Sequence, residues 1–307
     1  MKHATIALAF LTTLSAAAAA HDFNFSLGND AYQAENYDVA FREWKPLAEV
    51  GIAEAQFNIG LMHYHGQGVP QDFVEAVKWY RLAADQEFIE AQNYLGKMHF
   101  SGQGTPQNYI EAVKWYRLAA EQNNSNAQFN LGIMYRSGFG IAQDLATAIK
   151  WYRLAAEQGN SNAQLNLGIM YRSGLGVTQD LATAVKWYRL AAEQGNSNAQ
   201  LNLGIMYRSG LGVTQDLVTA IKWYRLAAEQ GNSNAQLNLG LIYEYGLGLP
   251  QNNLMAHAWY QMAANNGYKQ AFEYMADRAA QMNTEDIIKA QSMAKECMNS
   301  GYKKCGY

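Results

Sequence analysis

The stretch SNAQLNLGIMYRSGLGVTQDLATAVKWYRLAAEQGN runs from Ser161 to Asn196, and almost the same string begins again at Ser197. It contains a GLG loop, an aspartate, a lysine, an arginine and a tryptophan, all of which occur in catalytic sites. An active site needs several different groups that converge at one place. Near-perfect repetition instead favours an extended surface built from identical units.

The repeat has a period of 36 residues and covers most of the chain. Glycines recur at this interval from Gly60 to Gly240, and an alanine column keeps the same register from Ala55 to Ala271. Trp–Tyr pairs follow the same spacing, and the pattern extends from about residue 24 to about residue 281. Such a period predicts stacked structural repeats rather than several globular domains.

Each repeat is predicted to form two helices. In the quoted unit, the first is expected over residues 162–173, where apolar positions follow helical spacing, and it ends at Gly174. The second is expected over residues 181–194, after Asp180 in the N-cap position. Gly168 inside the first helix costs about 1 kcal/mol against alanine. A glycine at this position therefore predicts that another helix approaches its backbone closely.

A single helix pair of this size cannot bury its apolar face alone. We therefore predict an all-α fold, a right-handed α-α superhelix (solenoid) of about eight helix pairs. In the capping pairs, Glu43-Trp44 replaces Trp-Tyr and Ala276 replaces the column glycine. A last helix is expected at about residues 285–298.

The columns resemble a known family. Leu167-Gly168-x-x-Tyr171 followed by Ala184-x-x-x-Tyr188-x-x-Ala191 is similar to the tetratricopeptide signature. The 36-residue period, the G-x-G between helices and the A-x-K-W-Y-R-L-A-A string narrow the resemblance to Sel1-like repeats. This resemblance implies protein-complex assembly, envelope or signalling roles. The expected organisation is a signal peptide at 1–20, a capping helix pair at 21–52, six Sel1-like repeats at 53–268 and C-terminal capping helices with a disulfide at 269–307.

The first twenty residues predict export. Lys2 and His3 precede an apolar segment and a run of small residues that ends at Ala20, the expected cleavage site. This segment is too short to span a bilayer, and no other run reaches the ~18 apolar residues of a membrane helix. We expect a periplasmic or secreted protein of a Gram-negative bacterium. The net charge of -3 argues against a general nucleic-acid binder.

The two cysteines, Cys297 and Cys305, lie near the C-terminus. In an exported chain an even pair is more typical of a disulfide than of a metal site. The spacing resembles the pairs of cysteine-rich Sel1-like proteins, which carry one pair per repeat. A single pair here is expected to clamp the end of the chain.

The search for catalytic and cofactor motifs gives no strong candidate. A helix precedes the GLG loop where a dinucleotide fingerprint needs a strand, and neither H-E-x-x-H nor G-x-S-x-G occurs. His63 and His99 share a column but have no third ligand column, so no metal, cofactor or catalytic residue is predicted. Ser300-Gly301-Tyr302-Lys303 matches S-x-x-K without S-D-N or K-T-G. Some cysteine-rich Sel1-like proteins have been labelled penicillin-binding or β-lactam-hydrolysing, which keeps that activity as an alternative.

Charged columns of the second helix, from Lys78 to Lys222 and from Arg81 to Arg225, are expected to form a solvated face with ion pairs. The first helix gives the candidate binding surface. By tetratricopeptide geometry, Asn162, Asn166, Ile169 and Arg172 should face the concave side. The predicted protein- or peptide-binding residues are Asn126, Asn130, Arg136, Asn162, Asn166, Arg172, Asn198, Asn202 and Arg208.

Amides and guanidinium groups suit peptide backbone and carboxylates. The alternative is a merely polar, solvated wall. Tyr64, Tyr94, His99 and Phe100 make the wall aromatic in earlier repeats and predict a second subsite. The leading hypothesis is an exported non-enzymatic scaffold that binds a protein or peptide in its concave groove. The alternatives are a β-lactam-binding or hydrolysing protein and a structural envelope component that binds cell-wall material.

Overall fold

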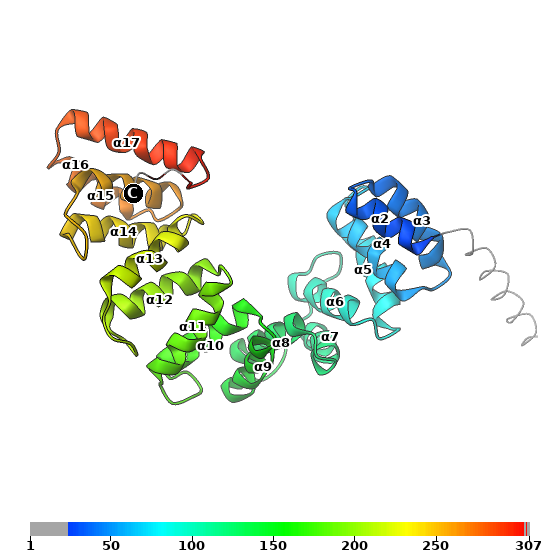
Figure 1. The fold of residues 1–307 in the computed structure, drawn as a ribbon. Coiled ribbons are helices and arrows are strands. Elements are labelled where there is room, and N and C mark those ends of the chain that lie inside the picture. The colour runs from blue at the N-terminus through cyan, green and yellow to red at the C-terminus, as the bar shows by residue number, and fades with distance from the viewer. Residues whose placement is uncertain (1–23, 304, 306–307) are drawn as a thin grey trace, which may run out of the picture. The chain divides into compact units, whose positions relative to one another are not determined.

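The computed structural model describes residues 24–303 and 305, and all regular elements in this part of the chain are helices (Figure 1). The signal peptide predicted for residues 1–20 lies outside the described residues. The helices are α2 (Phe25–Gln33), α3 (Tyr37–Glu49), α4 (Ala53–His65), α5 (Phe73–Ala84), α6 (Ile89–Ser101), α7 (Tyr109–Glu121), α8 (Ser125–Ser137), α9 (Leu145–Glu157), α10 (Ser161–Ser173), α11 (Leu181–Glu193), α12 (Ser197–Ser209), α13 (Leu217–Ala228), α14 (Ser233–Tyr245), α15 (Asn253–Asn265), α16 (Ala271–Ala279) and α17 (Thr284–Asn299).

The chain forms two compact units, with a boundary after Trp151 inside α9. Within each unit most helices pack on the next along the chain, for example α4 on α5 in the first unit and α12 on α13 in the second, whereas the last helix, α17, packs on α15. The sixteen helices described follow the 36-residue repeat, which confirms the predicted all-α repeat fold. Among the described residues, no helix is long and apolar enough to cross a membrane.

The GLG loop is a connection between helices. Gly174 ends α10 in the left-handed conformation, with φ of 66°. Asp180 then begins α11, because its Oδ1 accepts the Thr183 N–H at 2.9 Å and its Oδ2 accepts the Thr183 hydroxyl at 2.6 Å. The second loop glycine lies against the preceding repeat, where a Cβ on Gly212 would overlap the Leu181 backbone. Both glycines and the aspartate therefore have structural roles.

Each helix pair closes through contact of a tyrosine ring with a glycine. The Tyr188 ring, fully buried, lies over Gly168, where an added Cβ would stand 2.5 Å from Cδ1. Four further described repeats place the same pair in contact: Gly60 with Tyr80, Gly96 with Tyr116, Gly204 with Tyr224, and Gly240 with Tyr260. At the N-terminal pair, Trp44 takes the place of the tyrosine and covers Gly28. The helical glycine thus allows the close approach that the sequence predicted.

A buried glutamine in each repeat connects three consecutive helical segments. Gln200 Nε2 donates to the Ala192 carbonyl of the preceding repeat at 3.1 Å, and its Oε1 accepts from Gln230 Nε2 at 2.8 Å. The same buried column comprises Gln56, Gln92, Gln128, Gln164, Gln200 and Gln236. A buried amide costs free energy unless it is hydrogen-bonded. These contacts therefore favour a single register between neighbouring repeats.

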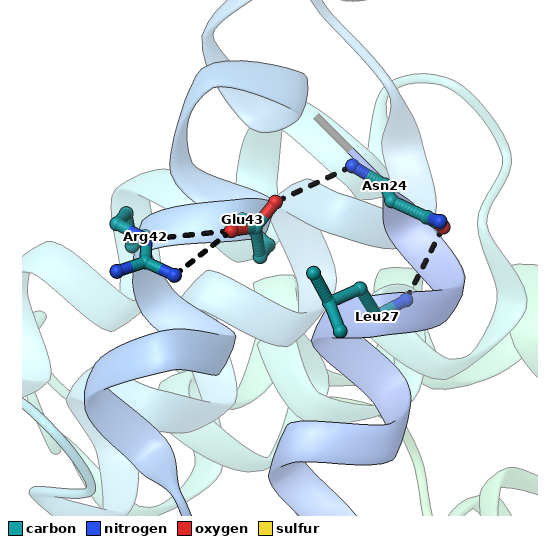
Figure 2. A network of polar contacts seen from close by, with 4 residues as sticks. All are labelled: Asn24, Leu27, Arg42 and Glu43. Atoms are coloured by element: carbon teal, nitrogen blue, oxygen red, sulfur yellow. Dashed lines mark hydrogen bonds and ion pairs between the residues drawn. The ribbon is translucent and has the colours of Figure 1, made fainter. Parts of the chain in front are cut away.

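The first and last helices are held in place by contacts that the central repeats do not have. Glu43 stands where the repeats have tryptophan and is buried, with its carboxylate accepting from the Asn24 N–H at 3.4 Å and from Arg42 Nη2 at 3.2 Å (Figure 2). It thereby ties α3 to the start of α2. At the other end, Cys297 and Cys305 form a disulfide that holds the segment after α17 against that helix.

We predict that Gly168→Ala destabilises the second unit. Overpacking against Tyr188 should cost about 1–3 kcal/mol, and the better helix propensity of alanine returns about 1 kcal/mol. The net loss in the free energy of unfolding should be up to roughly 2 kcal/mol, measured by urea denaturation. In a Tyr188→Leu background the same substitution should cost less. An equal cost in both backgrounds would show that the ring contact is not the cause.

Candidate functional site

The predicted surface residues of the second unit form hydrogen-bonded rungs between the first helices of successive repeats. Arg172 Nη1, on α10, donates to Asn202 Oδ1, on α12, at 2.9 Å. Arg208, on α12, makes the same bond to Asn238, on α14, also at 2.9 Å. We call each of these Arg–Asn pairs a rung. All four side chains are half-buried, so the guanidinium groups are held in place rather than extended into water.

A second set of amide contacts borders the rungs. Asn162 Oδ1 accepts from Asn196 Nδ2 at 3.2 Å, and Asn198 Oδ1 accepts from Asn232 Nδ2 at 3.1 Å. Asn202 Nδ2 in turn donates to the carbonyl of Asn198 at 2.8 Å. The asparagines at 162 and 198 are exposed and the asparagine at 166 is half-buried. The structure therefore gathers amide and guanidinium groups on one face of the second unit.

The first unit has a different surface at the corresponding positions. On α8, Asn126 is exposed and Arg136 half-buried, while Asn130 Nδ2 donates to Asn93 Oδ1 at 3.3 Å. Upstream, Lys97 Nζ lies 5.0 Å from the centre of the Tyr64 ring and 5.7 Å from that of Tyr94. These two tyrosine rings are 6.1 Å apart. At Tyr64 and Tyr94, aromatic rings beside a lysine thus stand where the second unit has an arginine and an asparagine.

The second subsite predicted from four aromatic residues is only partly assembled. His99 is buried, and its Nε2 lies 3.2 Å from Arg81 Nη2, so it does not share a surface with Tyr64 and Tyr94. Phe100 is half-buried in the same column as Tyr64, and it packs against Tyr109 and Phe139 as Tyr64 packs against Phe73. The prediction was wrong for His99, because the neighbouring column of the helix points to a different neighbour.

Several arginines of the second helices donate hydrogen bonds to tyrosine hydroxyls of the following repeat. Arg153 Nη2 donates to Tyr171 at 2.7 Å, and Arg189 Nη2 donates to Tyr207 at 2.5 Å. The residue that donates and the residue that accepts belong to successive repeats. These bonds are a further inter-repeat contact, on exposed arginines of α9 and α11.

The row of arginines ends at a charge reversal that the sequence analysis did not identify. Glu244 stands 36 residues after Arg208. It pairs with the buried Arg278 and accepts the hydroxyl of Tyr260. The sequence alone could have predicted this charge reversal, because Glu244 occupies the column of Arg208 in the next repeat. The buried glutamines were missed for a different reason, since polar residues beside the alanine column were assigned no role.

The tyrosines beneath the rungs are neutral over a wide pH range. Burial raises the pKa of Tyr188 to about 12, and the nearby positive charge of Arg172 partly opposes this shift. Tyr224 behaves in the same way, with its pKa raised by burial to about 12 and partly lowered by Arg208. Each rung therefore lies over an uncharged hydroxyl at neutral pH.

The residues considered for catalysis or metal binding are Ser300 and His63, and both lie in partly buried surroundings. Ser300 is half-buried at the end of α17, and its hydroxyl donates to the Cys297 carbonyl at 2.8 Å. His63 is half-buried, and burial lowers its pKa. No group of three or more histidine, cysteine or acidic side chains within residues 24–303 and 305 is placed to hold a metal ion.

The chain belongs to the Sel1 repeat family. The family profile, described as Sel1 repeat, matches residues 53–88, 89–124, 125–160, 161–196, 197–232 and 233–268. The chain is similar in structure to a protective antigen of uropathogenic Escherichia coli that displays an SLR fold, with a TM-score of 0.78, 36% identity, and coverage of 92% of this chain and 64% of that one. A Sel1 repeat protein from Oxalobacter formigenes gives a TM-score of 0.70 at 36% identity, covering 77% of this chain and 94% of that one.

Among curated proteins, the DAP3-binding cell death enhancer 1 of Rattus norvegicus is 40% identical over 55 residues. The match covers 18% of this chain and 11% of that protein, so the chain corresponds to a small part of its curated relative. Sel1 repeat proteins are generally protein-interaction scaffolds and typically not enzymes. The predicted family and fold class are thereby confirmed.

We predict alkaline loss of stability in the second unit. Burial raises the folded-state pKa of Tyr188 to about 12 from its ordinary value of 10.0. Since deprotonation is easier in the unfolded chain, the contribution is full below pH ~10 and is lost as pH rises towards ~12. Two pKa units correspond to about 2.7 kcal/mol. Between these pH values, Tyr188→Phe should gain up to that amount relative to wild type in urea unfolding.

The control for this experiment is Tyr245→Phe, which removes the hydroxyl of a residue that is 63% exposed. This variant should follow the wild-type pH dependence. If Tyr188→Phe also follows it, burial of the Tyr188 hydroxyl does not contribute to alkaline unfolding.

Proposed function

We propose that this protein is an exported, non-enzymatic scaffold that binds a protein or peptide along the asparagine and arginine surface of its first helices. The rungs Arg172–Asn202 and Arg208–Asn238 are the observation that carries the proposal. Asn162, Asn166 and Asn198 are proposed to line the same groove in the second unit. Asn126, Asn130 and Arg136 are proposed to form the corresponding surface of the first unit. Asn202 accepts from one of the five N–H donors of Arg172, and a guanidinium group can donate the others to a ligand.

The chemistry favours carboxylates and peptide backbone as ligands. A guanidinium group binds a carboxylate through two parallel hydrogen bonds, and asparagine amides both donate to and accept from peptide groups. Holding the arginines on asparagines before binding lowers the entropy lost when a ligand is bound. The uncharged tyrosines below the rungs add no competing negative charge at neutral pH.

The location is part of the same proposal. The basic start, apolar segment and small residues up to Ala20 support export to the periplasm or medium. The disulfide between Cys297 and Cys305 is in keeping with an oxidising compartment. The protective antigen of uropathogenic Escherichia coli, similar over 92% of this chain, supports a bacterial surface or secreted role.

We predict that reversing the charge of two rungs weakens ligand capture. Arg172→Glu with Arg208→Glu should reduce capture at least ~10-fold, because each arginine lost from a carboxylate pair removes roughly 1.5–3 kcal/mol. The measurement is affinity capture from periplasmic extract and culture medium, with mass-spectrometric identification of bound proteins. Binding of each identified ligand is then titrated in increasing salt.

The matched control is Arg153→Glu with Arg189→Glu. These arginines also carry inter-repeat hydrogen bonds in the second unit but belong to the second helices. Both double variants should retain the wild-type helical circular dichroism. Undiminished capture by the rung variant, or an equal loss in the control, would overturn the assignment of the surface.

A further inference from the structure

A cavity of about 320 Å³ opens in the first unit between the N-terminal capping pair and the first full repeat. Its lining includes Asn29, Tyr32 and Gln33 from α2, Trp44 from α3, and Glu54 and Asn58 from α4. This volume lies at the lower end of the range for ligand sites, which is roughly 300–1,000 Å³. The cavity therefore has room for one long side chain or a small molecule.

The aromatic walls of the cavity are held in fixed positions. The Tyr32 hydroxyl donates to Gln67 Oε1 at 2.8 Å, and the Tyr32 and Trp44 ring centres are 5.4 Å apart. Trp44 Nε1 donates to the Phe25 carbonyl at 3.3 Å, which orients the indole. Burial raises the pKa of Tyr32, so its hydroxyl stays protonated. The two rings thus form a preformed apolar corner.

The polar part of the lining is rich in oxygen acceptors. Glu54 is exposed in the first turn of α4 and supplies the one charged group of the lining. Asn29, Gln33 and Asn58 add amide oxygens, and no lysine or arginine lines the cavity. A carboxylate beside tyrosine and tryptophan rings is the arrangement that binds an organic cation, through charge and cation–π attraction.

Two residues that line the cavity occupy the same repeat columns as residues of the proposed binding surface. Glu54 stands 72 residues before Asn126, and Asn58 stands 72 residues before Asn130, two whole periods in each case. The cavity therefore uses the same positions of a first helix as the binding surface. The cavity differs by having the acid Glu54 in the column that holds an exposed asparagine from Asn126 onward.

We propose that this cavity binds the basic side chain, lysine or arginine, of a protein ligand, with Glu54 neutralising the charge and Tyr32 and Trp44 contacting the alkyl stem. The proposal rests on the proposed function, since the side chain belongs to a bound protein segment. The acid at Glu54 excludes an acidic side chain from the cavity by like-charge repulsion.

The test uses small probes, so that it does not require the natural ligand. N-acetyl-lysine N-methylamide, the isosteric norleucine derivative, the glutamate derivative and N-acetylglucosamine are titrated against the full chain by saturation-transfer NMR. The lysine probe should bind at least about five-fold more tightly than the norleucine probe. The glutamate probe should not bind, and N-acetylglucosamine should bind more weakly than lysine.

Two matched variants locate the binding. Glu54→Gln should abolish the preference for lysine over norleucine. Glu90→Gln should preserve it, because Glu90 occupies the same column position in the first turn of α6 and does not line the cavity. Both substitutions remove an acid from a helix start, so any general effect on stability is shared.

Several results would overturn the proposal: equal binding of lysine and norleucine, stronger binding of the sugar, or a preference that survives Glu54→Gln. Loss of the preference in both glutamine variants would do the same. The Arg172→Glu, Arg208→Glu protein should bind the lysine probe as wild type does. If the lysine probe does not bind the cavity, the capture experiment still tests the rungs. If the rung variant captures ligands like wild type, the probes still test the cavity.

Discussion

The contact between a tyrosine ring and a helical glycine determines how closely the two helices of each repeat approach. The Tyr188 ring occupies the space that a side chain on Gly168 would fill, and four other repeats described by the structure have the same contact. A helical glycine costs about 1 kcal/mol in propensity. The burial of a whole tyrosine ring more than offsets this cost. The positions of the polar groups on the repeat surface follow from the close approach.

The hydrogen bonds between repeats depend on that spacing. Gln200 reaches the Ala192 carbonyl of the preceding repeat and the Gln230 amide of its own, and both bonds are buried or partly buried. Hydrogen bonds between N–H and oxygen usually span about 2.7–3.2 Å, so these contacts are matched to the present distance between helices. The exposed side of the same stack carries Arg172 on Asn202. The register of the repeats and the positions of the Arg–Asn rungs are therefore fixed by the same packing.

Periodicity was sufficient to predict the helices, the Asp180 cap and the close approach at Gly168, because these depend on residues within one repeat. The contacts between repeats were harder to predict. Arg153 donates to the Tyr171 hydroxyl of the next repeat. The sequence alone does not distinguish this partner from the glutamate one turn away on the same helix. The buried role of the glutamine column also required the distance to the neighbouring helix. Positions along a helix follow from sequence, whereas partners across helices follow from packing.

Identical repeats place identical groups at regular intervals, and such a row by itself has no defined end. In this chain the arginine column ends at Glu244, which is neutralised by Arg278, and the column of exposed asparagines is replaced upstream by Glu54. The substitutions also change the charge that a ligand meets. A carboxylate ligand is favoured at Arg172 and Arg208 and disfavoured at Glu54. Under the proposed function, the repeats supply a uniform surface for peptide backbone and carboxylates, and the positions where repetition fails supply the selectivity for one ligand over another.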